Sequence, residues 1–248
     1  MRVFHGTDRL PAFRRPAATV GSYDGVHGGH YKLLDAVRRF ARERDGESVV
    51  VTFAPHPRIV LETQTDLRLL STLDEKVWLL ERAGIDNLVV IPFTREFSRT
   101  SSADFIRRDL VGKLGIEALV MGYNHHFGHN KEGDYGSLRS AERPELQLCR
   151  IGRFCVDGEK VSSTAVRTLV EHGEMARAAR MLCHPYLLIA GCEQGRLHID
   201  DPYKLLPPAG EYPVTADGEP ARLYIPSEGT PLLDLPLTRE KSLIEFTP

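Results

Sequence analysis

Two histidines flank a glycine pair at His27-Gly28-Gly29-His30, between a short apolar stretch and a segment whose apolar residues recur at helical spacing. At such a strand-to-helix turn, unpaired backbone N–H groups and the positive end of the helix dipole favour an anion. Glycines let a ligand approach the backbone, and imidazoles can donate hydrogen bonds to it. The motif therefore predicts a phosphate site; a glycine turn with incidental histidines is the alternative.

A second candidate anion site lies at Ser162-Ser163-Thr164, where hydroxyl side chains open a predicted helix and Arg167 follows one turn later. The hydroxyls, the helix start and the planar guanidinium together favour a phosphate group. An ordinary N-cap followed by a surface arginine is the alternative. Two such helix starts in one chain favour a polyphosphate bound between them.

Asp24 is the acidic residue nearest the first turn. Three roles are open to it: it could orient an imidazole, bind a metal through water, or stabilise the turn.

Polar segments follow two further predicted strands, at residues 52–57 and 122–134. Ligands of open α/β sheets bind beyond the carboxyl ends of strands, so both segments are candidate ligand loops. A proline-stiffened loop with a surface histidine is the alternative for the first, and a core anchor at Phe127 is the alternative within the second. His126 and His129 are three residues apart, but a loop rich in Asn and Gly rarely fixes tetrahedral geometry. We therefore predict no metal-ligating residues.

The first two thirds of the chain alternate strand-like and helix-like segments, which is typical of a parallel sheet covered by helices. Strands are expected at 17–23, 48–53, 88–91, 118–122 and 146–151, and helices at 30–44, from the Thr72 and Glu75 capping box to Gly84, after Ser101, at 161–170 and at 175–182. Residues 123–140 are expected to form a long polar connection. After residue 185, short alternating runs at 186–192, 212–215, 221–225 and 243–246, among Pro and Gly, predict a small β structure.

The composition narrows the classes of partner. The chain has 248 residues, of which 42% are hydrophobic and 27% charged, and 32 Lys and Arg are offset by 34 Asp and Glu. Without a basic excess we expect no nucleic-acid partner. No charged-then-apolar leader and no bilayer-length apolar run occur, and the four cysteines form no close pair. We expect a cytoplasmic protein with reduced thiols and no membrane partner. Walker, dinucleotide-binding and GxSxG signatures are absent.

Four of these segments resemble motifs of bacterial FAD synthetases, over residues 17–185. Residues 21–30 resemble GxFDGVHxGH, with Ser22 and Tyr23 in place of the usual Asn and Phe, and residues 161–167 resemble VSSTxIR. Both motifs are shared across the nucleotidylyltransferase superfamily. Residues 52–57 resemble TFxPHP and residues 122–134 resemble GxDFxFGxxxxGD, which are closer to the flavin branch. In the latter, Asn124 and His125 replace the frequent Asp and Phe.

The resemblance implies a Rossmann-like α/β nucleotidylyltransferase domain over 1–185 and a small, truncated β-barrel-like domain over 186–248. The implied activity is FMN adenylyltransferase, which transfers AMP from ATP to FMN to give FAD and pyrophosphate, with Mg²⁺ accompanying ATP. In bifunctional members a carboxy-terminal barrel with a PTAN signature phosphorylates riboflavin. Residues 186–248 lack PTAN, although 204–214 resemble part of that barrel. We therefore expect a degenerate remnant without riboflavin kinase activity. The alternatives are a non-catalytic flavin-nucleotide-binding paralogue and a nucleotidylyltransferase for another phosphate monoester.

The resemblance also implies three groups of site residues. The catalytic group is His27, His30, Ser163, Thr164 and Arg167; the ATP-binding group is Gly21, Ser22, Tyr23, Asp24, Gly28, Gly29 and Ser162; the flavin-binding group is Thr52, Pro55, His56, Pro57, Asn124 and Phe127. The implied chemistry is in-line attack of the FMN phosphate on the α-phosphorus of ATP. A phosphate monoester with a second pKa of about 6 is largely dianionic at neutral pH, so we expect the histidines to stabilise charge rather than act as bases.

Overall fold

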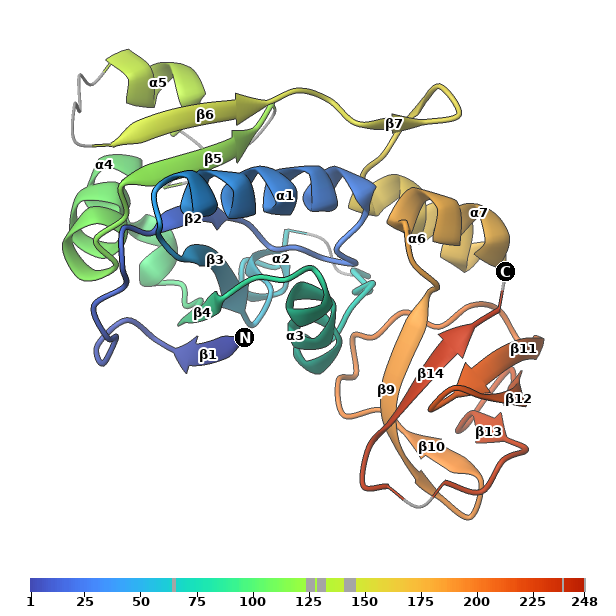
Figure 1. Ribbon diagram of the computed structural model, residues 1–248. Coiled ribbons are helices and arrows are strands. Elements are labelled where there is room, and N and C mark those ends of the chain that lie inside the picture. Colours follow the sequence, from blue (N-terminus) through green and yellow to red (C-terminus); the bar gives the residue numbers. More distant parts are fainter. Residues whose placement is uncertain (64–65, 124–127, 129–132, 141–145, 238, 248) are drawn as a thin grey trace. The chain divides into compact units, whose positions relative to one another are not determined.

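A computed structural model of the protein describes residues 1–63, 66–123, 128, 133–140, 146–237 and 239–247 (Figure 1). The chain forms two compact units. The first unit comprises residues 1–23, 29–67 and 77–154, and the second comprises residues 24–28, 68–76 and 155–248. The second unit thus includes two short segments from early in the chain. The division into domains after residue 185 stays a prediction.

The first unit contains a parallel sheet of six strands in the order β1-β4-β3-β2-β5-β6. The strands are β1 (Arg2–His5), β2 (Ala17–Val20), β3 (Ser48–Ala54), β4 (Asn87–Pro92), β5 (Ala118–Gly122) and β6 (Gln147–Ile151). Strand order reverses between β2 and β5, and ligands of such sheets bind at the carboxyl ends beside this reversal. The first phosphate motif directly follows β2, so the topology places it at this point.

Helices bury both faces of the sheet. On one face, Ala36, Val37 and Ala41 of α1 (Gly28–Glu43) pack against β2 and β5. On the other face, Phe105 and Ile106 belong to the cluster that includes buried residues of β3 and β4. The four inner strands, β2 to β5, are mostly apolar because both of their faces are buried. The predicted α/β fold with a parallel sheet is confirmed.

The remaining helical segments are mostly short. They are α2 (Pro57–Val60), α3 (Leu73–Arg82), the 3-10 turn η1 (Phe97–Arg99), α4 (Ser102–Asp104), the π-helix η2 (Phe105–Lys113) and α5 (Tyr135–Ser140). The predicted capping box begins α3: the Thr72 amide donates to Glu75 Oε2 at 2.9 Å, and the Glu75 amide donates to Thr72 Oγ1 at 3.2 Å. Ser101 caps α4 as predicted, accepting from the Asp104 amide at 3.1 Å. In contrast, α5 occupies the end of the expected polar connection.

The second unit contains a closed barrel with the strand order β10-β13-β12-β11-β14-β9 (Figure 1). Its strands are β9 (Leu187–Glu193), β10 (Arg196–His198), β11 (Gly210–Ala216), β12 (Glu219–Ile225), β13 (Leu232–Leu233) and β14 (Ser242–Phe246). The unit also holds α6 (Ser163–Glu171), α7 (Met175–Leu182) and a hairpin of β7 (Cys155–Val156) and β8 (Glu159–Lys160). The expected barrel-like architecture is confirmed, and its six strands form a closed barrel.

Five strands were not anticipated: β1, β7, β8, β10 and β13. Each has two to four residues, too few for a recognisable period-2 pattern, and each is defined by its partner strand. No helix among the described residues combines the length and apolar character needed to cross a bilayer.

Candidate active site

The first phosphate motif forms a buried turn between β2 and α1. Three of its residues have left-handed backbone angles, with φ of 49° at Tyr23, 77° at Gly25 and 38° at Val26. Glycine adopts this conformation freely, but a fully buried, β-branched Val26 is strained in it. Such strain persists only where the surroundings fix the backbone. Helix α1 begins at Gly28, two residues before the predicted start, so the amides of residues 28 and 29 belong to its first turn.

Asp24 fixes this turn from within. Its side chain is buried, and its Oδ1 accepts hydrogen bonds from the amides of Leu70 at 2.8 Å and Ser71 at 3.1 Å. Its Oδ2 pairs with Arg167 Nη2 at 2.9 Å. The Gly25 amide donates a hydrogen bond to Ser71 Oγ at 2.9 Å. Of the roles weighed for Asp24, turn stabilisation is the one that these contacts support.

The second phosphate motif begins α6 and is bonded directly to the first. Ser163 Oγ donates to the Asp24 carbonyl at 2.9 Å, and Arg167 Nε donates to the Arg68 carbonyl at 2.7 Å. Arg167 is only 7% exposed, so the alternative of a surface arginine is wrong. Its guanidinium is also not the open fork that was expected, because Nε and Nη2 already bond within the protein. A phosphate contact would therefore fall to Nη1.

Two of the three hydroxyl groups at the start of α6, those of Ser162 and Ser163, bond within the protein. Ser162 is the N-cap, and its Oγ accepts from the Ala165 amide at 3.2 Å. Ser163 uses its hydroxyl hydrogen on Asp24, and Thr164 is exposed. The amides of Ser163 and Thr164 lie in the first turn, where intrahelical partners are lacking. At Ser163 we therefore assign anion contact to the backbone amide rather than to the side chain, whereas at Thr164 both the amide and the exposed hydroxyl stay candidates.

His27 is neutral at physiological pH. Burial lowers its pKa to about 4; the nearby carboxylate of Asp24 opposes the shift and His184 adds to it. A neutral imidazole carries one N–H donor and one acceptor nitrogen. His184 also contacts the turn itself, with its Nε2 3.0 Å from the Gly25 carbonyl. The His27 side chain therefore carries no positive charge near pH 7. It would contact a phosphate through a hydrogen bond rather than through an ion pair.

Tyr23 and His30 pack against each other within the first unit. Their ring centroids are 4.8 Å apart, with 48° between the ring planes. Tyr23 is 1% exposed, and its hydroxyl lies 2.7 Å from Thr19 Oγ1. Burial raises the pKa of this phenol, which stays protonated. Tyr23 was predicted to contact ATP, but its polar atom faces the interior, and it supports His30 by packing.

At the ends of β2 and β3, Ser22 of the predicted ATP-binding group lies next to Thr52 of the predicted flavin-binding group. The Gly21 amide donates to the Val51 carbonyl at 3.0 Å, and the fully buried Thr52 donates from Oγ1 to the Ser22 carbonyl at 3.3 Å. The hydroxyl of Thr52 thus holds the neighbouring strand end.

The loop after β3 presents the predicted flavin-side imidazole. The Ala54–Pro55 peptide bond is cis, Pro55 is exposed, and Pro57 is the first residue of α2. His56 is half-buried, and its Nδ1 accepts from the Arg58 amide at 3.2 Å, so the ring caps α2. An accepting Nδ1 places the ring N–H on Nε2 in the neutral form. Asn124 and Phe127, the other predicted flavin residues, lie outside the described residues, as do His125, His126 and His129.

Lys76 was not anticipated from the sequence. It lies in the first turn of α3 and is 6% exposed. Burial lowers its pKa to about 8, and the carboxylates of Asp24 and Asp201 oppose the shift. Ser71 was missed as well. No local sequence pattern marks either residue, because their partners are distant in the sequence. The Ser71 amide bonds to Asp24, Lys76 interacts with the Asp24 charge, and the bond from Gly25 to Ser71 spans 46 positions.

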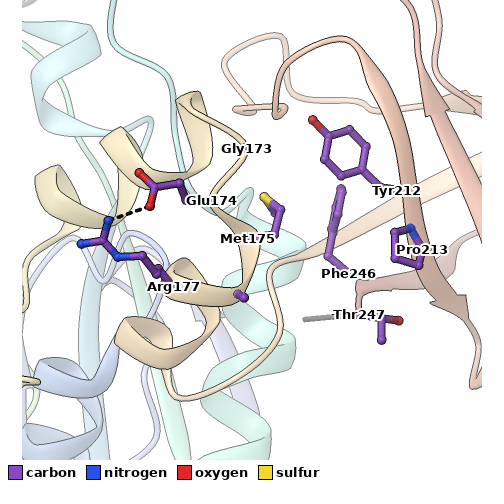
Figure 2. Close-up of a pocket in the computed structure, with 9 residues that line it drawn as sticks. Gly173, Glu174, Met175, Arg177, Tyr212, Pro213, Phe246 and Thr247 are labelled. Atoms are coloured by element: carbon purple, nitrogen blue, oxygen red, sulfur yellow. Dashed lines mark hydrogen bonds and ion pairs between the residues drawn. The ribbon is translucent and has the colours of Figure 1, made fainter.

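A pocket of about 360 Å³ lies elsewhere in the second unit (Figure 2). Tyr212 and Phe246 of the barrel form one wall and the start of α7 forms the other, with the Met175 side chain directed into the space between them. Glu174 and Arg177 pair at its rim at 2.6 Å. None of the residues that line this pocket belongs to the predicted site groups, so it is separate from the two phosphate motifs.

Comparison with known proteins identifies relatives over most of the chain. Residues 11–165 match the family model of FAD synthetase. A bifunctional riboflavin kinase/FMN adenylyltransferase from Escherichia coli is 32% identical over 183 residues, which are 72% of this chain and 58% of that protein. The protein with the same description from Listeria monocytogenes is 28% identical over 208 residues, 79% of this chain and 66% of its own length. The chain thus matches about three fifths to two thirds of these relatives.

Structural comparison supports the architecture. A crystal structure described as a macrolide-efflux protein from Streptococcus pneumoniae superimposes with a TM-score of 0.84, over 99% of this chain and 90% of that one. The two sequences are 19% identical, so this likeness shows a shared fold.

Proposed function

This chain belongs to the FAD synthetase family, and we propose that it transfers AMP from MgATP to FMN, forming FAD and releasing pyrophosphate. The observation that carries the proposal is the direct bonding of the two anion motifs. Asp24 beside the histidine turn binds both Ser163 and Arg167 of α6. This contact supports a single polyphosphate that meets the amides at both helix starts.

The proposed reaction needs no general base from the protein. An oxygen of the FMN phosphate attacks the α-phosphorus of ATP in line, and the bond from that phosphorus to the oxygen bridging to the β-phosphorus breaks. The attacking phosphate is already largely dianionic at pH 7, since its second pKa is about 6. His27 and His30 donate hydrogen bonds as charge builds on the transferring group. The neutral state of His27 supports this role.

Mg²⁺ enters as part of the nucleotide substrate. Bound to the phosphates, it would neutralise part of the charge on the departing pyrophosphate. The engaged carboxylate of Asp24 supports the view that ATP and water, rather than this acid, coordinate the ion.

We assign the flavin side to the ends of β3 and β5. His56, held by the α2 amide and the flanking prolines, would donate from Nε2 to FMN. Thr52 supports the strand end, and Asn124 and Phe127 are proposed to contact the flavin on the strength of the family motif alone. Riboflavin phosphorylation is not part of the proposal, because residues 186–248 contain no PTAN sequence.

The deciding experiment incubates the purified protein with FMN, ATP and Mg²⁺ and follows FAD by chromatography and pyrophosphate by a coupled assay. FAD and pyrophosphate should form in equal amounts with FMN, and riboflavin in a parallel reaction should remain unchanged. Conversion of riboflavin to FMN would disprove the absence of kinase activity. Pyrophosphate release with another phosphate monoester but not with FMN would change the substrate. Binding of FMN without turnover would identify a non-catalytic flavin-binding protein.

A further inference from the structure

The barrel is bonded to the turn at Asp24 through a buried ion pair. Lys204, in the loop between β10 and β11, pairs with Glu75 Oε2 at 2.6 Å, and the two side chains are 1% and 0% exposed. Lys204 Nζ also donates to the carbonyls of Leu70 at 2.7 Å and Leu187 at 2.9 Å. All three ammonium hydrogens therefore have acceptors.

Glu75 connects the same group to strand β9. Its Oε1 accepts from the Ile189 amide at 3.0 Å, and its Oε2 accepts from the Thr72 amide as well as from Lys204. The Lys204 ammonium lies 4.3 Å from the ring centroid of Tyr186, whose hydroxyl donates to the Leu205 carbonyl at 2.7 Å. Burial lowers the pKa of Lys204 and raises the pKa of Glu75, and their mutual contact opposes both shifts. A buried polar network of this kind fixes one arrangement when every member is satisfied.

One residue separates this network from the phosphate turn. The Leu70 carbonyl accepts from Lys204, and the Leu70 amide donates to Asp24 Oδ1. The neighbouring Leu69 is fixed on both sides as well, because its amide donates to the Tyr203 carbonyl at 2.7 Å and its carbonyl accepts from the Leu205 amide at 2.8 Å. The segment 68–72 is thus hydrogen-bonded both to the barrel loop that carries Lys204 and to Asp24.

We propose that the barrel serves the nucleotide site, with Lys204 and Glu75 as positioning residues that hold segment 68–72 in the register required by Asp24 and the His27 turn. This inference rests on the proposed function. Neither side chain is placed in contact with substrate, since each is fully engaged within the protein. Their loss would let segment 68–72 shift, and with it the amides that bind the Asp24 carboxylate. The barrel would then be a structural part of the adenylyltransferase whatever chemistry it performs itself.

The test is Lys204→Met in the full chain, with steady-state kinetics for both substrates and calorimetric binding of a non-hydrolysable ATP analogue. The KM for ATP and the Kd for the analogue should rise about tenfold, because small displacements of positioning groups are costly at a reacting centre. The KM for FMN should stay within about twofold, since the flavin loop has no part in this network. Glu75→Gln/Lys204→Met, which leaves no unpaired charge, should keep the elevated KM for ATP while recovering thermal stability.

The matched control is Leu223→Ala, which removes a fully buried side chain of β12 in the same barrel. It should lower the unfolding temperature at least as much as Lys204→Met, yet leave the KM for ATP within about twofold. Equal effects of the two variants on the KM for ATP would overturn the inference, as would an unchanged KM for ATP in Lys204→Met. A wild-type protein that binds the analogue but makes no FAD would refute the proposed function, and the inference would then be decided by binding alone. A wild-type protein that does not bind the analogue would refute both.

Discussion

The turn at Asp24–Gly28 and the loop at Ala54–Pro57 each present an imidazole after a strand of the same parallel sheet, but they are held in different ways. The turn is buried, contains a strained Val26 and is fixed by a carboxylate with three partners. The loop is largely exposed or half-buried, and its histidine accepts a hydrogen bond from the Arg58 amide at 3.2 Å. Substitutions in the turn should therefore affect folding and catalysis together, whereas substitutions in the loop should affect substrate binding alone.

The largest expected effect is that of Asp24→Ala. It leaves Arg167 buried without its ion-pair partner and removes the acceptor for two amides, which should cost about 3–5 kcal/mol of unfolding free energy. Urea denaturation followed by circular dichroism measures this, and FAD formation should fall below detection. Glu174→Gln is the control, because its pair with Arg177 is surface-exposed; it should leave both properties unchanged. Equal unfolding curves for the two variants would contradict the stabilising role of Asp24 in the turn.

The pH dependence of stability should also distinguish the buried turn, which holds His27, from the more exposed loop, which holds His56. The pKa of His27 is about 4 in the folded protein against 6.5 when unperturbed, so between these values the unfolded chain binds a proton that the folded chain does not. Stability is thus unaffected above pH 6.5 and falls as the pH drops toward 4, by about 3 kcal/mol in total. Urea unfolding at a series of pH values measures this loss. His27→Gln should flatten the curve in that window, whereas His56→Gln should leave it steep.

His30→Ala is expected to lower kcat for FAD formation about 100-fold, as for other lost transition-state donors. Initial rates at saturating FMN and ATP measure this. The exposed His172 provides the control, since His172→Ala removes an imidazole outside the proposed site. Full activity in His30→Ala would rule out its assignment as a donor to the phosphates.

The smallest expected effect is that of His56→Ala. Loss of one hydrogen bond to FMN should raise the KM for FMN about tenfold and leave the KM for ATP and the unfolding midpoint unchanged. Kinetics with each substrate varied in turn, and a thermal melt, give the three values. A marked loss of stability would show that the loop is as tightly integrated as the turn.

Local patterns predicted the parts of the molecule that local interactions form. The Thr72 and Glu75 capping box, the apolar run of β3 and the helical spacing of α1 all have their cause within one segment. Helices were predicted to start at residues 30 and 161 for the same reason, and the observed starts at Gly28 and Ser163 lie two residues away. A resemblance to known motifs then added the substrates, which spacing alone left open.

The partners of these segments could not be predicted in the same way. Asp24 meets Leu70 across 46 positions and Arg167 across 143, and Lys204 meets Glu75 across 129. Nothing in the neighbourhood of these residues distinguishes an engaged carboxylate or guanidinium from one open to ligand. The sequence therefore indicated candidate functional segments, while tertiary contacts decide which of their side chains remain available for chemistry.

Closure of the six-stranded barrel also bears on how the protein avoids unwanted association. Every barrel strand has a neighbour on both sides, so fewer backbone groups are left unpaired to recruit another chain than at an open sheet edge. The parallel sheet, in contrast, ends at β1 and β6. Strand β1 has four residues and carries Arg2, and such short, charged borders are poor templates for intermolecular pairing. During folding, the barrel is therefore exposed to such pairing until its last strand closes it, whereas at the β1 edge the folded sheet depends on a short, charged strand.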